Sequence, residues 1–180
     1  MNNRIAVEEW GLYNSGFLAC KWWGAVSSME DINKYYQALR KKHGVFPTDD
    51  LELFIADFDT ELENKSILDE NTMIDKALEI LEQIDGLNTD ELEIVSYLME
   101  MEGIKDIETA IESIEDIIVY DFERSWNIDE DFGIMMAEEM GIFTKETAHL
   151  EHYFNFAAYG RSFLHDGYTK HNGKVFYFSK

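Results

Sequence analysis

The 180-residue chain contains 37 Asp and Glu residues against 15 Lys and Arg residues, which gives a formal net charge of −22. A field of that sign repels phosphate, and this excludes direct binding to nucleic acid or to an anionic membrane as the main function. With 46% hydrophobic and 14% aromatic residues the chain is predicted to be globular, and a single cysteine without a signal peptide or a long apolar run indicates a cytoplasmic protein without an internal disulfide.

The negative charge is concentrated in the middle of the chain. Residues 49–151 hold 32 acidic and five basic side chains, a net charge of −27, whereas the two ends together hold ten basic and five acidic ones, a net charge of +5. Adaptation to salt would make the whole surface acidic, so this asymmetry favours a local function for the acidic segment.

Residues 1–62 are predicted to form a small α+β domain with strands at residues 4–8, 17–23 and 51–59. A helix should lie between the second and third strands, because Ser28 and Asp31 form a capping pair and Gly44 follows a run of basic residues. Cys20 falls in the apolar second strand and is interpreted as a small core residue.

Residues 63–103 are predicted to form an acidic helical domain. One amphipathic helix carries Ile74, Leu78 and Leu81 on its apolar face and ends at Gly86. A second amphipathic helix begins at Asn88, which forms a capping pair with Glu91, and it ends by Gly103.

Residues 104–180 are predicted to form a C-terminal α+β domain. Its expected elements are a helix at 107–114, a strand at 117–122, helices at 132–140 and 144–164, and a strand at 175–178. The 144–164 helix should break at Asn155, and Asn172-Gly173 predicts a tight hairpin before the last strand. The fold class is therefore α+β, built from three small domains.

Acidic residues recur on the predicted helices at spacings of three and four residues. Like charges at these spacings repel each other by a few tenths of a kcal/mol per pair, a loss of stability that a function should explain. Such carboxylates lie roughly 5 Å apart along a helix axis, which is comparable with the phosphate spacing of about 3.4 Å per strand in duplex DNA. Imitation of a DNA backbone is one interpretation, and ordinary solvated helix faces are the other.

The carboxylates assigned to the candidate DNA-mimic surface are Asp69, Asp75, Glu79, Glu82, Asp90, Glu91, Glu93, Glu100, Glu102, Glu108, Glu112, Glu115, Asp116, Glu123, Asp129, Glu130, Asp131, Glu138 and Glu139.

A calcium site fits one segment in part. The residues at positions 1, 3, 5 and 12 of an EF-hand loop would be Asn127, Asp129, Asp131 and Glu138. Position 6 is Phe132, and the glycine follows one place late at Gly133, so an acidic first turn entering a helix is the favoured interpretation.

No metal, cofactor or catalytic residue is predicted. His149 and His152 lack the remaining ligands of a zinc site and are interpreted as surface or interface residues. The sequence contains no nucleophile elbow, phosphate-binding loop or dinucleotide fingerprint, so no enzymatic activity is expected.

Three separated stretches resemble the ArdA antirestriction proteins. The first is Ile5-Ala6-Val7 followed by Leu12-Tyr13-Asn14-x-Gly16-x-Leu18 and Trp22; the second is FIADFD at 54–59; the third comprises AEEMGIF at 137–143, HYFNFAAYGRSF at 152–163 and HNGKVF at 171–176. The resemblance covers roughly the first 60 and the last 45 residues, and the acidic middle matches in character more than in motif.

This resemblance implies an elongated DNA mimic that occupies the DNA-binding groove of type I restriction-modification enzymes, contacts their DNA-binding and methyltransferase subunits, and spares incoming mobile DNA from cleavage. It also implies a homodimer. The family's antirestriction motif corresponds here to residues 142–155, and the implied dimer-contact residues are Ile142, Phe143, Leu150, Tyr153 and Phe154.

The chain departs from the family pattern near this motif. Thr144-Lys145-Glu146-Thr147 replaces a start that commonly contains proline, Asn155 stands where Asp is common, and Gly160-Arg161-Ser162 replaces Ala-Arg-Asp. These departures bear on the strength of the dimer.

Two other classes of function are compatible with part of the sequence. An acidic chaperone, or an inhibitor of another basic DNA-binding protein, would explain the charge equally well. A calcium-binding protein would explain only residues 127–138.

Overall fold

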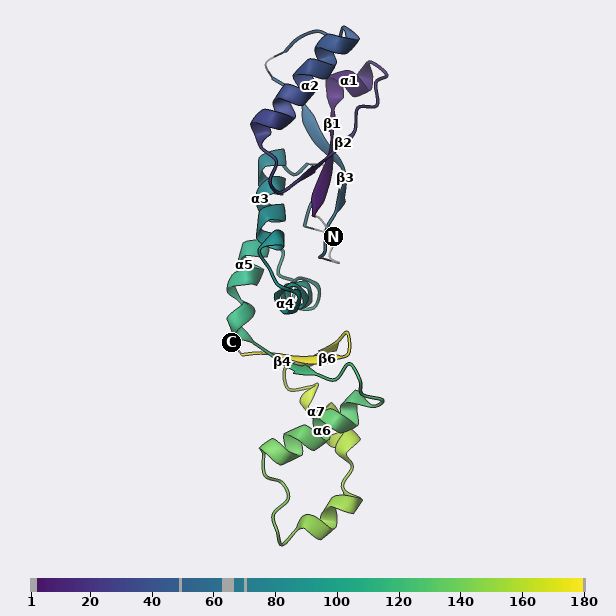
Figure 1. Ribbon diagram of the computed structural model, residues 1–180. Helices are drawn as coiled ribbons and strands as arrows, with labels where there is room; N and C mark the ends of the chain where they lie inside the picture. The colour runs from purple at the N-terminus through teal and green to yellow at the C-terminus, as the bar shows by residue number, and fades with distance from the viewer. Residues whose placement is uncertain (1–2, 49, 63–66, 70, 180) are drawn as a thin grey trace. The chain divides into compact units, whose positions relative to one another are not determined.

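The computed structural model describes residues 3–48, 50–62, 67–69 and 71–179 and is α+β, as predicted (Figure 1). The described residues form two three-stranded antiparallel sheets and a set of helices. The chain divides into two compact units, Met1–Glu112 and Ser113–Lys180. The predicted boundary after residue 62 adjoins residues 63–66, which lie outside the described residues, and the division into three domains stays a prediction.

The N-terminal unit is built on a sheet whose central strand is β1 (Arg4–Glu9), with β2 (Lys21–Gly24) and β3 (Leu53–Asp59) on its two sides. Helix α2 (Met29–His43) lies along this sheet (Figure 1). It begins and ends as predicted, because the Ser28 side chain accepts a hydrogen bond from the Asp31 backbone N–H and Gly44 adopts a left-handed conformation. Tyr36 of α2 is buried and donates a hydrogen bond to the Val7 carbonyl oxygen, which fixes the helix on the sheet.

A short helix, α1 (Trp10–Asn14), lies between β1 and β2, where the sequence analysis predicted no helix. The buried Glu9 side chain caps it by accepting a hydrogen bond from the Leu12 N–H, 2.8 Å away, and forms an ion pair of 2.7 Å with Arg40 of α2. The cap itself is local, but the cation that pairs with the buried Glu9 carboxylate comes from 31 positions away.

The interpretation of Cys20 as a core residue is wrong, because its side chain is exposed. The predicted strand at 17–23 forms only over Lys21–Gly24, and residues 17–20 leave α1 as irregular chain. The adjacent Trp22 and Trp23 behave as alternating strand residues should, with Trp22 exposed and Trp23 buried.

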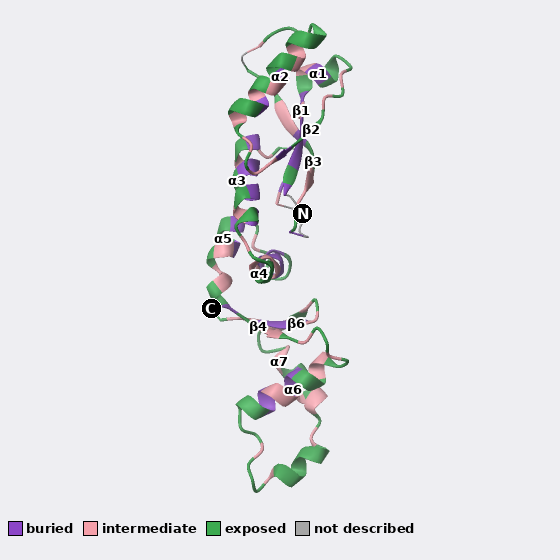
Figure 2. Cartoon of the chain, viewed as in Figure 1, coloured by how far each residue is buried: buried purple, intermediate pink, exposed green. Residues whose placement is uncertain are grey.

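Three helices complete the N-terminal unit: α3 (Ile74–Asp85), α4 (Thr89–Glu100) and α5 (Ile107–Glu112). Most of their apolar residues are buried and most of their charged residues are exposed, as the sequence periodicity predicted (Figure 2). Helix α4 begins with the predicted capping box of Asn88 and Glu91.

The C-terminal unit contains the sheet β4 (Ile117–Asp121), β6 (Lys174–Phe178) and β5 (Tyr168–His171), in that order, preceded by a 3-10 turn at Ile114–Asp116. Helices α6 (Ile128–Glu139) and α7 (Phe156–Phe163) pack against each other, and Phe132, Met136 and Val175 form the core. The predicted hairpin is confirmed, because Asn172 and Gly173 both have positive φ angles, 45° and 81°.

The predicted helical stretch at 144–164 is interrupted at Asn155, as expected. Asn155 caps α7 through a hydrogen bond from the Ala158 N–H. The first part is a 3-10 helix, Ala148–Tyr153, in which every residue is exposed.

Candidate functional site

Helix α3 presents an unobstructed acidic face. Asp75, Glu79 and Glu82 are all exposed and lie one and two helical turns apart, while Ala77 and Leu81 on the other side are buried. Among the described residues of this face, Glu79 forms an ion pair of 3.5 Å with Lys76, and the two side chains are 64% and 43% exposed. Such a pair contributes little stability in water, so these carboxylates remain available to an external cation.

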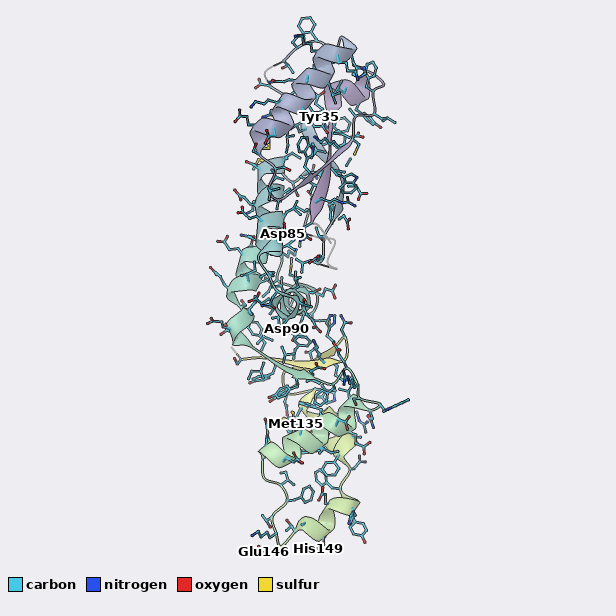
Figure 3. All side chains as sticks on the ribbon, viewed as in Figure 1. Tyr35, Asp85, Asp90, Met135, Glu146 and His149 are labelled. Atoms are coloured by element: carbon cyan, nitrogen blue, oxygen red, sulfur yellow. The ribbon has the colours of Figure 1, made fainter. Side chains whose placement is uncertain are left out.

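One carboxylate of α4 and one just after this helix make hydrogen bonds within the fold. The Glu91 carboxylate accepts a hydrogen bond of 2.8 Å from the Asn88 N–H, and the Glu102 carboxylate accepts one of 2.7 Å from the Tyr97 hydroxyl. Asp90 is exposed in the first turn, where the helix dipole favours an acidic residue (Figure 3). The sequence assigned all three to one surface, but two of them also stabilise the fold.

Helix α5 and the turn after it contribute four exposed carboxylates: Glu108, Glu112, Glu115 and Asp116. None of the four side chains has a hydrogen bond or ion pair with another described residue. Glu108 and Glu112 belong to the N-terminal unit, and the other two belong to the C-terminal unit.

Asp106 was missed by the sequence analysis. Its carboxylate accepts hydrogen bonds from the Thr109 N–H at 2.9 Å and the Thr109 hydroxyl at 2.8 Å, and these bonds lower the pKa of Asp106. The Asp106-x-x-Thr109 spacing immediately before Ile107 is a helix-start signal that could have indicated this cap.

Asp129 has a structural role that its place in the predicted acidic surface did not reveal. Its half-buried carboxylate contacts Lys170 of β5 at 2.5 Å and Arg161 of α7 at 3.3 Å. The hydrogen bond from Lys170 is the main cause of a lowered pKa for Asp129. The carboxylate therefore joins three elements of the C-terminal unit and is neutralised there.

The same contacts argue against an EF-hand at residues 127–138. Asn127 is the N-cap residue of α6 and residues 128–138 form nearly all of this helix instead of a loop, and Phe132 is buried in the core. Across the described ranges, no group of three or more His, Cys, Asp or Glu residues is arranged to hold a metal ion.

Most of the predicted acidic surface is exposed. Of the nineteen carboxylates assigned from sequence, sixteen belong to exposed residues, and Glu91, Glu93 and Asp129 are half-buried. Asp131, Glu138 and Glu139 of α6 are exposed and make no side-chain hydrogen bond or ion pair with another described residue. The sequence periodicity thus identified the solvent-facing side of each helix correctly.

Three basic residues of the N-terminal segment are held by internal ion pairs. Arg40 pairs with the buried Glu9, Arg4 with Asp59 at 3.0 Å, and Lys34 with Glu30. The positive charge of these segments is therefore partly neutralised within the N-terminal unit.

The residues expected at a dimer contact fall into two groups. Tyr153, Leu150 and Ile142 are exposed, with exposed fractions of 86%, 48% and 41%. Phe143 and Phe154 are half-buried and pack edge to face with ring centroids 5.2 Å apart, so they hold residues 142–155 to α7 through Phe156. His149 and His152 are exposed on the same segment, and Figure 3 labels His149 on it.

Comparison with protein families gives one match, to the family described as antirestriction protein (ArdA), over residues 5–176. The chain belongs to the ArdA antirestriction family. Comparison with curated proteins gives no match. The family match includes the acidic middle of the chain, where individual motifs were weak.

Membership of this family implies an antirestriction function, exerted as an inhibitor of restriction enzymes. It agrees with the absence of a recognisable catalytic motif in the sequence. Within the described residues, no helix is both long enough and apolar enough to cross a membrane.

Proposed function

We propose that this ArdA protein inhibits type I restriction-modification enzymes by occupying their DNA-binding groove in place of DNA. The observation that carries the proposal is the set of exposed carboxylates at helical spacing on α3 and α5. Asp75, Glu79, Glu82, Glu108 and Glu112 all face solvent, and only Glu79 has an ion-pair partner among the described residues.

The chemistry of the DNA-binding groove makes such a surface an effective competitor. Enzymes that bind DNA neutralise phosphates with several Lys and Arg side chains, and much of the binding free energy comes from this electrostatic interaction. Carboxylates held on rigid helices at roughly 5 Å intervals along the axis offer these cations a similar series of partners. The chain needs no cofactor and performs no reaction in this role.

We further propose that the target surface includes the DNA-binding and methyltransferase subunits, and that the inhibitor is a homodimer formed through residues 142–155. The exposed Tyr153 and Leu150 support a contact there, because large apolar side chains gain stability when a partner covers them. Inhibition of this kind would protect incoming mobile DNA from cleavage.

An acidic chaperone of a basic protein is the alternative that the charge leaves open. The two functions differ in a measurable way, because a generic chaperone has no reason to block a type I endonuclease stoichiometrically. The test is therefore titration of the purified protein against the endonuclease activity of a type I enzyme, at two ionic strengths.

A series of neutralised variants tests the mechanism of inhibition. We expect Glu108→Gln, Glu112→Gln and Glu115→Gln together to weaken inhibition modestly, and addition of Glu79→Gln and Glu82→Gln to weaken it further in rough proportion. Higher salt should weaken the unmodified protein through the same electrostatic interaction. Removal of like charges should also raise stability by a few tenths of a kcal/mol per pair.

Asp129→Asn is the control for the loss of a single negative charge, because this carboxylate is already paired internally. It should change inhibition less than neutralisation of one exposed carboxylate does. Complete loss of inhibition at a single carboxylate, with the others silent and no effect of salt, would contradict backbone mimicry.

A further inference from the structure

The N-terminal unit contains an open groove of about 530 Å³ that combines aromatic and acidic side chains. Its aromatic lining is Trp10, Tyr13, Phe54 and Phe58, and its acidic lining is Glu8, Asp57 and Asp69. None of the described residues that line it is basic. Only Asp69 was part of the acidic surface assigned from sequence.

The groove lies on the face of the sheet that α2 leaves uncovered. Ile5 and Val7 of β1 are fully buried on the α2 side, and the alternation of a strand places Arg4 and Glu8 on the opposite side. The register pairs Glu8 with Phe54, so these two side chains lie next to each other on that face.

The aromatic rings form a rigid wall. Trp10 stacks on Phe54 with ring centroids 4.2 Å apart and an interplanar angle of 21°, and Tyr13 packs edge-on against Trp10 at 5.5 Å. The Trp10 backbone N–H donates to the Glu52 carbonyl oxygen at 3.0 Å, which anchors α1 to the chain entering β3. Trp10 and Tyr13 nevertheless remain 39% and 45% exposed, so the wall is open to a ligand.

The carboxylates make the local potential negative. Glu8 has no side-chain hydrogen bond or ion pair with another described residue, and Asp57 accepts only from the N–H of its neighbour Phe58. The pKa of the exposed Cys20 thiol is raised first by partial desolvation and then by the negative charges of Glu8 and Asp57.

The same face of the sheet already holds one arginine between an aromatic ring and a carboxylate. The Arg4 guanidinium lies 4.6 Å from the centroid of the Trp22 ring, and its Nη2 and Nε donate to Asp59 at 3.0 and 3.2 Å. A planar guanidinium suits this arrangement because it stacks on a ring and donates sideways to a carboxylate, which the compact ammonium of lysine does less well.

We infer that the groove bounded by Trp10, Phe54 and Asp57 receives an arginine side chain of the inhibited restriction enzyme. The inference rests on the proposed function, which supplies a partner with an arginine-rich DNA-binding surface. Binding of an arginine in the groove adds a short-range contact to the interaction between this protein and the enzyme. Salt screens that contact less than it screens the contacts made by exposed carboxylates. It thereby adds selectivity for arginine to a surface that would otherwise recognise positive charge alone.

Direct binding tests the groove without the enzyme. The probe is N-acetyl-L-arginine methylamide, and binding is followed by the NMR signal of the Trp10 indole N–H, assigned by its loss in Trp10→Leu. We expect a saturable shift, at least about threefold weaker binding of the lysine analogue, and loss of the shift in Asp57→Asn. Equal binding of both analogues, or none of either, would overturn the inference.

Inhibition of the type I endonuclease provides the second measurement. Trp10→Leu and Asp57→Asn should each raise the concentration needed for half inhibition about five- to tenfold, by a similar factor at both ionic strengths. The matched controls are Phe46→Ala, which removes an exposed aromatic ring, and Glu52→Gln, which removes an exposed carboxylate; neither residue lines the groove, and both variants should inhibit as the unmodified protein does.

The two proposals fail in different ways. If the unmodified protein does not inhibit the enzyme, the proposed function is refuted. If it inhibits and folded Trp10→Leu and Asp57→Asn inhibit equally well, only the arginine groove is refuted. Asp57→Asn keeps an oxygen acceptor for the Phe58 N–H, so its fold should be preserved, and thermal melting checks this.

Discussion

Gly133 of α6 and Gly160 of α7 lie at the point where these two helices cross, and neither position has room for a side chain. A Cβ atom on Gly133 would lie 2.0 Å from the Phe156 carbonyl oxygen, and one on Gly160 would lie 2.0 Å from the Asp129 carbonyl oxygen. Both obstacles are backbone atoms, which cannot rotate away. The glycine that stood one place late for an EF-hand is thus required by helix packing.

Alanine at this crossing should destabilise the C-terminal unit. In an open helix, Gly→Ala stabilises by about 1 kcal/mol, but here the added methyl group must push two backbones apart. We expect Gly133→Ala and Gly160→Ala each to lower the free energy of unfolding by about 1–3 kcal/mol, measured by urea denaturation.

Gly24→Ala is the control for this prediction. Its Cβ would meet the nearest backbone atom, the Asn3 carbonyl oxygen, at an ordinary 3.5 Å, so we expect little change. Equal stability of Gly133→Ala and the unmodified protein would contradict the close helix crossing.

The Asp129 ion pairs should make stability depend on pH. The pKa of Asp129 is lower in the folded protein than in the unfolded chain, so its contribution is present above the unfolded value, near 4, and is lost as the pH falls through the folded value. We expect Asp129→Asn to lower the free energy of unfolding at pH 7 by about 1–2 kcal/mol, since two charged donors lose their partner.

Asp131→Asn provides the comparison, because Asp131 is exposed and has no such partner among the described residues. The difference in the free energy of unfolding between Asp129→Asn and the unmodified protein should be smaller at pH 3 than at pH 7. The Asp131→Asn variant should show no comparable dependence on pH. A stability difference between Asp129→Asn and the unmodified protein that is the same at both pH values would contradict the role assigned to Asp129.

The proposed dimer makes a prediction at Tyr153. Because this side chain is 86% exposed, Tyr153→Glu should not disturb the fold of one chain, but a carboxylate buried in a symmetric contact would be costly. We expect sedimentation to show that the variant is a monomer, and circular dichroism to show that its helical spectrum is unchanged. Sedimentation of the unmodified protein as a monomer alone at micromolar concentration would refute the dimer.

Calcium should have no specific effect on this protein. The central carboxylate of the apparent loop, Asp129, is bound to Arg161 and Lys170, and Gly133 packs against α7. We expect millimolar calcium to change the melting temperature no more than magnesium does, measured by thermal denaturation at constant ionic strength. A rise with calcium that magnesium fails to reproduce would contradict this.

The sequence by itself determined the features that depend on neighbouring residues. The start of α2 at Ser28, the capping box of α4 and the hairpin at Asn172 were predicted because each is stabilised within a few residues. The exposed stripe of Glu79 and Glu82 was equally predictable, since helical periodicity alone separates the apolar from the acidic side. The family resemblance also came from short continuous motifs.

Only the tertiary structure decided the roles that depend on distant partners. The buried Glu9 carboxylate is paired with Arg40 of α2, Cys20 is exposed because the strand starts after it, and the groove beside Trp10 exists because α1 packs on β3. Carboxylates that look alike in sequence differ for the same reason: Asp129 is neutralised by residues 32 and 41 positions away, whereas Asp131 faces solvent. Local patterns fix which side of a helix is charged, but pairing between distant segments determines which charges remain free to bind a partner.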